Sequence, residues 1–237
     1  MIILLIILFA ATTIIGFFYL KGVLSWLVGI FSLLVLAFSM VGLIYHDNTH
    51  WGMKEVTTRT SHEIYTAGDP AQAWGLVIKA EIGTNTGNYV FVYRNGIDDK
   101  KPETNFKPDT KHIVEAVLKS ANYQLTSDSN AKVVTNTTRY EWSNNLAKWL
   151  FGVGGEAGDL VKQRSTVYVP KDTWLLLTAA QVEKLQKELP TLQAQMKAQL
   201  AANPAEALQL QELQKNNPTA YAAMQVTQIK KILGITD

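Results

Sequence analysis

Two long apolar segments at the start of the chain constrain its fold more than any other feature. Residues 2–20 and 23–45 contain no charged side chain, and only Lys21 and Gly22 lie between them. A helix needs about 20 apolar residues to cross the ~30 Å hydrocarbon layer of a bilayer, and each segment is long enough. A lysine and a conformationally permissive glycine at the junction suit a tight turn. The sequence therefore predicts a transmembrane helical hairpin with the lipid bilayer as its first partner.

A cleaved secretory signal is the alternative for the first segment. The segment lacks the basic start and the small-residue cleavage site that are typical of such signals. The chain contains no cysteine, which excludes a lipoprotein anchor, disulfides and thiol chemistry. We therefore expect a two-span protein of the cell membrane.

The orientation of the hairpin rests on weaker signals. Two spans place both ends of the chain on the same side of the membrane. Lys54 and Arg59 follow the second span and favour the cytoplasm, although large domains are translocated regardless of such charges. The absence of cysteine and the Asn- and Thr-rich strands favour the outside. We expect the large domain to be extracytoplasmic.

Small residues recur along one stripe of the second span. They are Gly22, Ser25, Gly29, Ser32 and Ser39. Such a stripe allows another helix backbone to approach closely. Three occupants remain open: the first span, another integral membrane protein, or a second copy of this chain.

The stretch YHDNTHWG, residues 45–52, places two histidines four residues apart. On a helix, His46 and His50 would share a face, as a metal site requires. Two histidines fall short of the three or four ligands that zinc takes, and Asp47 would point off that face. Aromatic rings also gather where a helix leaves the bilayer. We interpret the stretch as an interfacial belt, keep His46 and His50 as metal candidates, and expect no cofactor. His62 and His112 have no ligand spacing and are expected on the surface.

Residues 46–177 are expected to form a β-rich antiparallel domain. Apolar and polar residues alternate along Leu76–Ile82, which reads as a half-buried strand, and the chain returns along Tyr89–Arg94 as a hairpin. Segments 111–126 and 144–151 each fit a helix or a strand, and residues 172–178 are expected to lead out of the sheet. Further strands are expected at 53–66, 131–142 and 164–170.

Residues 178–237 are expected to form a helical tail. Thr178 and Gln181 have the spacing of a capping box, and Asn203-Pro204 and Asn217-Pro218 each read as the start of a helix. Pro190 should kink or restart the first helix, which gives three or four short helices. The fold class is therefore membrane-anchored α+β, divided as 1–45, 46–177 and 178–237.

No catalytic motif emerges. Gly152–Asp159 contains G-x-G-x-x-A, with Asp172 20 residues beyond Gly152, but no βαβ unit fits around it, so we interpret it as a flexible loop. The formal charge is +2 without a basic stripe, which gives nucleic acid no electrostatic footprint. We expect no catalytic or cofactor-binding residue.

Two aromatic strand patterns, TTRYEWSNNLAKWLFG (137–152) and RSTVYVPKDTWLLLT (164–178), together with the Ala/Gln/Leu tail, carry a resemblance. The chain resembles a family of uncharacterised membrane proteins of lactic-acid bacteria. That resemblance implies two N-terminal spans, a domain of unknown function, a Gram-positive envelope, and genes that neighbour drug-efflux transporters of the major facilitator class. It carries over no catalytic residue.

These observations favour a non-catalytic, membrane-anchored accessory or interaction protein of the cell envelope, associated with a transporter. An extracellular ligand- or glycan-binding module is the alternative, and an envelope enzyme is the third hypothesis.

Overall fold

The structure is a computed structural model that describes residues 1–235. Thr236 and Asp237, the end of the expected tail, lie outside the described residues. The chain forms two compact units, which we describe separately. Unit 1 comprises residues 1–58 and 137–162, and unit 2 comprises residues 59–136 and the chain from Gln163 onward. The boundary therefore falls inside three long strands.

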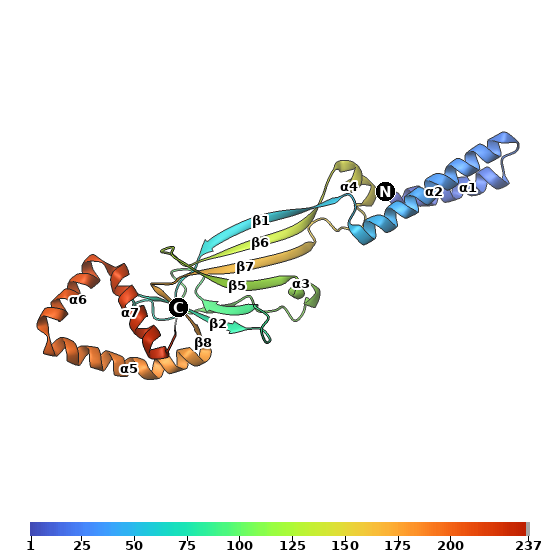
Figure 1. Ribbon diagram of the computed structural model, residues 1–237. Coiled ribbons are helices and arrows are strands. Elements are labelled where there is room, and N and C mark those ends of the chain that lie inside the picture. Colours follow the sequence, from blue (N-terminus) through green and yellow to red (C-terminus); the bar gives the residue numbers. More distant parts are fainter. Residues whose placement is uncertain (236–237) are drawn as a thin grey trace. The chain divides into compact units, whose positions relative to one another are not determined.

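The fold is α+β, with apolar helices first, sheets next and polar helices last (Figure 1). The helices are α1 (Ile2–Phe18), α2 (Val23–Thr49), α3 (Ile113–Val117), α4 (Asn145–Phe151), α5 (Ala179–Ala202), α6 (Pro204–Asn216) and α7 (Pro218–Leu233). The strands are β1 (Met53–Glu63), β2 (Gly75–Glu81), β3 (Tyr89–Tyr93), β4 (Glu103–Asn105), β5 (Lys119–Thr126), β6 (Lys132–Trp142), β7 (Leu160–Pro170) and β8 (Trp174–Thr178).

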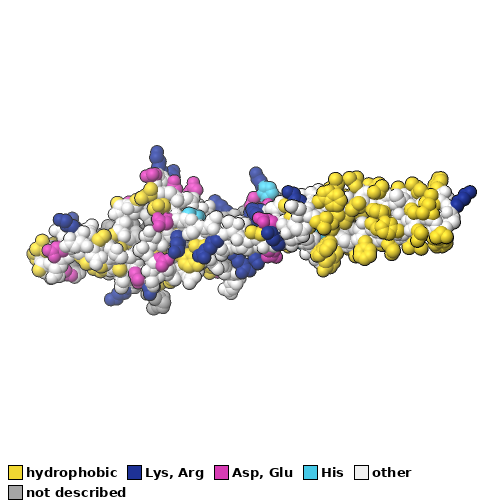
Figure 2. All heavy atoms as spheres, turned by 90° about the horizontal axis from the view of Figure 1, so that it is seen from above, with side chains coloured by type: hydrophobic (Ala, Val, Ile, Leu, Met, Phe, Trp, Pro, Cys, Tyr) yellow, Lys and Arg dark blue, Asp and Glu magenta, His cyan; other side chains and the backbone are white. Residues whose placement is uncertain are grey.

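The apolar start of unit 1 forms a helical hairpin, α1–α2. Gly22 adopts a φ of 68°, which favours glycine, and lies between the two helices. Within residues 1–235, α2 is the one helix that is both long and apolar enough to cross a membrane, since α1 has only 17 residues. At 1.5 Å per residue, α1 is about 25 Å long and α2 about 40 Å. The apolar side chains of the hairpin face outward (Figure 2).

Unit 2 contains a sheet with apolar residues on both faces. Val77 of β2 and Phe91 of β3 belong to one buried cluster, which also contains Val133 and Val167. The alternate residues of β2 and β8 belong to a second cluster with α5 and α7; its buried members include Leu76, Leu175, Leu177, Leu185, Val226 and Ile229. The sheet β4-β3-β2-β8 is therefore a middle layer, which explains the unbroken apolar runs in β2 and β8.

The expected antiparallel sheet is wrong in part, because both sheets are mixed. The hairpin β2–β3 is antiparallel as predicted, but β8 pairs with β2 in parallel and β5 pairs with β7 in parallel. Residues 172–178, expected to leave the sheet, instead supply β8. Alternation within β2 also predicted one buried face, whereas Val77 on the other face is fully buried. The parallel pairs join strands far apart in sequence, and the burial of Val77 comes from its packing in the cluster that contains Val133 and Val167.

The ambiguous segments and the tail follow local signals closely. Segment 111–126 contains both alternatives, α3 and then β5, and residues 144–151 form α4 with Asn144 as its cap. Thr178 and Gln181 form the predicted capping box, and the Asn217 side chain caps α7. Up to residue 235, the tail contains three helices, α5, α6 and α7.

Pro190 does not restart the first tail helix, because α5 is continuous from Ala179 to Ala202. A proline inside a helix removes one backbone hydrogen bond. Leu185 and Leu189 before the proline and Leu192 after it pack on the second cluster, so burial on both sides holds the helix together.

Candidate functional site

His46 lies in the last turn of α2 and is almost completely buried, with 2% of its surface exposed. Its imidazole is stacked between two rings of unit 1. The Phe151 centroid lies 4.3 Å away at an interplanar angle of 17°, and the Trp142 centroid lies 5.6 Å away at 22°. Phe151 ends α4 and Trp142 ends β6, so three separate elements meet at this ring.

Both nitrogens of His46 face oxygen atoms. Nδ1 lies 2.6 Å from the carbonyl oxygen of Trp51, and Nε2 lies 3.0 Å from Oε2 of Glu156. A carbonyl oxygen only accepts hydrogen bonds, so Nδ1 carries a proton.

The alignment of Nε2 and Oε2 is poor for a hydrogen bond, although their separation is that of an ion pair. Within residues 1–235 neither atom has another hydrogen-bond partner. Electrostatic attraction depends mainly on distance, so the contact remains favourable despite its angle. A positive charge on His46 would also be stabilised by the C-terminal end of α2.

The glycine-rich loop positions Glu156. Gly155 and Gly158 both adopt positive φ angles, and the Gly158 amide donates to the Tyr140 carbonyl at 2.8 Å. The Asp159 amide donates to the Glu156 carbonyl at 3.1 Å, which closes the turn. Gly155 and Gly158 allow the turns that bring the carboxylate to α2, whereas the fixed glycines of the G-x-G-x-x-A pattern, Gly152 and Gly154, do not have positive φ angles. Sequence reasoning missed Glu156, because no local signal joins it to His46.

His50 has a different environment from His46. It terminates α2 in the left-handed conformation, with φ 54°, and stacks on Tyr140 at 4.1 Å and 9°. Tyr45 and Trp51 lie 6.2 Å apart, centroid to centroid. In the part of the chain that the structure describes, no group of three or more His, Asp or Glu side chains could hold a metal ion. The arrangement joins α2, β6, α4 and the loop after α4 within unit 1.

The other two histidines are exposed. His62 lies on β1 and has no side-chain partner among residues 1–235, and the His112 Nδ1 atom lies 2.8 Å from Oδ2 of Asp109. The hydrogen bond between these two side chains raises the pKa of His112 and lowers the pKa of Asp109.

Part of the small-residue stripe packs inside the hairpin. A Cβ atom at Gly16 would lie 2.8 Å from the backbone nitrogen of Gly29, and a Cβ atom at Gly29 would lie 2.8 Å from the Phe17 ring. The Ser25 hydroxyl donates to the Gly16 carbonyl at 2.8 Å, and Ser32 is buried. Ser39 is partly buried and donates to the Val35 carbonyl, while Gly22 is exposed at the turn. The helix α1 therefore occupies the middle of the stripe.

One motif was overlooked in the sequence. Residues 129–132, SNAK, have the S-x-x-K spacing of some serine acyltransferases. The Lys132 Nζ atom donates to Oδ2 of Asp128 at 2.7 Å, and this hydrogen bond lowers the pKa of Asp128. A partly exposed, ion-paired ammonium cannot act as the base that such a serine needs.

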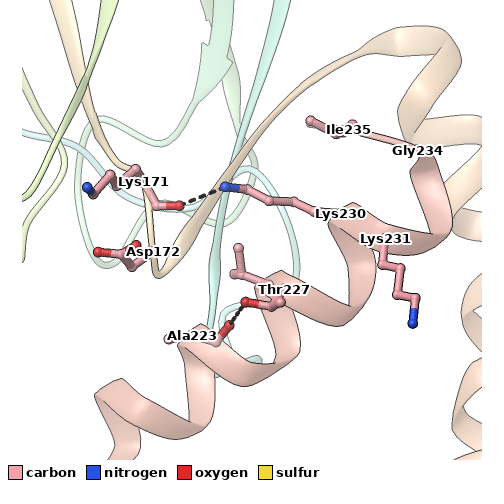
Figure 3. Close-up of a pocket in the computed structure, with 9 residues that line it drawn as sticks. Lys171, Asp172, Ala223, Thr227, Lys230, Lys231, Gly234 and Ile235 are labelled. Atoms are coloured by element: carbon pink, nitrogen blue, oxygen red, sulfur yellow. Dashed lines mark hydrogen bonds between the residues drawn. The ribbon is translucent and has the colours of Figure 1, made fainter. Parts of the chain in front are cut away.

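A hollow of about 520 Å³ lies beside α7 in unit 2, against residues 171–172 (Figure 3). The Lys230 ammonium donates to the Lys171 carbonyl at 3.1 Å. Figure 3 shows that Lys231 extends away from Lys171, so the lysines do not converge on one ligand.

The comparisons with known proteins give one match. Residues 21–185 match the family described as Domain of unknown function (DUF4811). The chain belongs to this family. The matched region begins at Lys21, so it includes α2, both sheets and the start of α5. No curated protein and no solved structure matches the chain.

Proposed function

We propose that this DUF4811 protein is a non-catalytic, membrane-anchored accessory or interaction protein of the bacterial cell envelope, associated with a transporter. The observation that carries the proposal is the outward-facing apolar surface of the hairpin. Phe38 is 79% exposed, Trp26 is 65% exposed, and Val23 is 76% exposed. The side chains of a soluble core helix would be buried instead.

Both helices of the hairpin cross the bilayer in this proposal. At 17 residues, α1 is at the short end of the range for a span. Its small residues pack on α2, so α1 and α2 insert as one body. An apolar hollow of about 680 Å³ between α1, α2 and α4 suits lipid chains, and its walls include Ile2, Phe31, Leu34, Val35 and Phe38.

The membrane orientation is tested with a single introduced thiol. Ser127 is exposed between β5 and β6, and the chain has no other cysteine. An extracytoplasmic domain predicts that Ser127→Cys is labelled by an impermeant maleimide in intact cells. Labelling that requires lysis would place the domain in the cytoplasm.

The accessory role is tested by purification of the tagged protein in mild detergent, followed by mass spectrometry. The stripe at Gly29 is occupied by α1, so a partner must use the outer surface of the hairpin. We expect a membrane protein in fixed stoichiometry that is lost with Phe38→Ala. The matched control is Val114→Ala, which changes an equally exposed residue of unit 2, also 79% exposed. Folded protein without a stoichiometric partner would contradict the accessory role.

A further inference from the structure

Arg94 is a buried cation without a carboxylate partner. It follows β3 in unit 2 and is only 8% exposed. Its backbone is fixed by two hydrogen bonds with Tyr65, at 2.9 and 3.0 Å. Within residues 1–235, no Asp or Glu oxygen lies within 4.0 Å of its guanidinium nitrogens.

Only one corner of the guanidinium is satisfied. Nη1 donates to the Gly68 carbonyl at 2.7 Å and to the Thr66 carbonyl. Nε is shielded from solvent and has no hydrogen-bond partner in the described chain. Nη2 forms no hydrogen bond to residues 1–235 and is not among their shielded, unpartnered atoms, so it reaches solvent. The Nε–Nη2 edge therefore forms no hydrogen bond to residues 1–235, although protein atoms cover Nε.

This arrangement is energetically unusual. A buried charge is costly unless an opposite charge and hydrogen bonds compensate it. The two carbonyl dipoles compensate Arg94 in part. The unpaired edge carries two parallel N–H groups, of which Nη2 reaches solvent and Nε is covered, and this fork matches the two oxygens of a carboxylate.

A hollow of about 270 Å³ opens at Arg94. Arg94 is the only charged residue among those that line it. The other walls are mostly aromatic or apolar and include Tyr65, Pro70, Trp74, Ile97 and Trp174, with one amide from Gln72. This combination of a single charged anchor, a few polar groups and aromatic or apolar walls is typical of small-molecule sites.

We infer that unit 2 binds a small organic carboxylate with a flat apolar body in this hollow, with Arg94 as its anchor. One oxygen accepts from Nη2, and the second accepts from Nε once neighbouring side chains move aside. The apolar body lies against the Trp and Tyr side chains. A phosphate group fits less well, because it is more strongly hydrated and no lysine lines the hollow to share its charge. The inference does not depend on the accessory role of the hairpin.

Benzoate is a suitable probe, with benzamide as its uncharged counterpart. The full-length protein in detergent is titrated while the indole N–H signals of its six tryptophans are followed by NMR. We expect benzoate to shift, saturably, the signals assigned to Trp74 and Trp174 by Trp→Phe substitution. Benzamide should shift the same signals with an affinity at least tenfold lower than that of benzoate.

Two variants separate binding from folding. Arg94→Lys keeps the charge but removes the fork, and we expect at least tenfold weaker binding of benzoate. That variant also removes the bond to Gly68, so it could disturb the fold. Ile97 is 72% exposed at the hollow, and Ile97→Glu places a competing carboxylate there without touching the core. Ile97→Glu should also lower the affinity for benzoate at least tenfold.

The matched control is Ile113→Glu, at a residue of unit 2 that is 67% exposed and does not line the hollow. It should leave benzoate affinity within twofold of the original chain. The inference is overturned if benzamide binds as well as benzoate, if Ile97→Glu binds normally, or if inorganic phosphate displaces benzoate at equal concentration.

Discussion

His46 and Glu156 come from separate segments of the chain, yet the Nε2 and Oε2 atoms of the two side chains lie 3.0 Å apart. The imidazole also lies between two aromatic rings and donates from Nδ1 to a backbone carbonyl. One contact therefore joins the end of an apolar helix to the loop after α4. The separation of the two atoms is that of an ion pair, although their alignment is poor for a hydrogen bond.

Removal of the carboxylate should destabilise unit 1. Glu156→Ala leaves Nε2 without a partner in a nearly dry cage, at a cost of about 1–3 kcal/mol. That corresponds to a melting temperature lower by roughly 2–4 °C for each kcal/mol. Glu156→Gln should retain most of the stability, because an amide N–H can donate to neutral Nε2. Thermal unfolding followed by circular dichroism in detergent measures both.

The control for this prediction is a second ion pair of unit 1. Glu55 lies 3.9 Å from Lys162, and both side chains are about half exposed. Exposed pairs of this kind contribute little, so Glu55→Ala should change stability by less than about 0.5 kcal/mol. If Glu55→Ala and Glu156→Ala lower the free energy of unfolding equally, the buried contact of His46 contributes no more to stability than an exposed ion pair.

The two glycines at the centre of the hairpin should respond differently to alanine. A Cβ at Gly16 meets the backbone of Gly29 at 2.8 Å, and this clash is relieved only if α1 and α2 move apart. A Cβ at Gly29 meets the Phe17 ring, which can rotate. We expect Gly16→Ala to cost about 1–3 kcal/mol and Gly29→Ala less. Resistance of the hairpin to proteolysis in detergent is the measurement.

Gly42, which lies on α2 like Gly29, supplies the control. A Cβ there would meet only Ile2 Cδ1, at 3.9 Å, which is ordinary van der Waals contact. Gly42→Ala should therefore be neutral or slightly stabilising, because alanine favours a helix. Similar effects from Gly16→Ala and Gly42→Ala would contradict the close packing between α1 and α2.

Elements with local signals could be predicted from the sequence. The capping box at Thr178, the turn between β2 and β3 and the apolar length of α2 each depend on residues within a few positions of one another. The parallel pairs β2–β8 and β5–β7 carry no such signal, because strand partners distant in sequence are chosen by burial on both faces.

The same limit applies to the sites. His46 attracts notice through its spacing from His50, but its real partner Glu156 sits in a loop whose glycines suggested a phosphate-binding pattern. Arg94 gave no signal at all in the sequence, since its burial follows from the loop that contains Thr66 and Gly68. Buried charges become visible only when the fold places carbonyls around them.

The exposed pair of His112 and Asp109 predicts a pH response. The side-chain hydrogen bond raises the pKa of His112 above its ordinary 6.5 and lowers the pKa of Asp109 below 3.8. The His112 contribution to stability is complete below its unfolded pKa and disappears as pH rises through the folded pKa. The Asp109 contribution is complete above its unfolded pKa and disappears as pH falls through the folded pKa. The pair therefore acts fully between these two ordinary values.

Titration of His112 by NMR tests this directly. Asp109→Asn should return the His112 pKa toward its ordinary value, because it removes the largest cause of the shift. Glu115→Gln should lower the pKa less, since Glu115 acts only through a weaker charge interaction. High salt should reduce the shift, because both groups are exposed. If the pKa of His112 is the same in Asp109→Asn as in the original chain, the pair does not form in solution.

Gly75 should be the glycine of unit 2 least tolerant of substitution. It pairs with Trp174 in the parallel β2–β8 register, and a Cβ there would lie 2.1 Å from Trp174 Cδ2. The indole covers the missing side chain, so Gly75→Ala should destabilise the protein by about 1–3 kcal/mol or more. Trp174→Leu should reduce that penalty in the double variant, measured as a positive coupling in thermal unfolding. Gly96→Ala is the control, because the three atoms nearest to its Cβ would belong to the Asp99 side chain, at 3.4 Å or more, which is ordinary contact. Strictly additive effects at Gly75 and Trp174 would argue against the parallel pairing that defines this sheet.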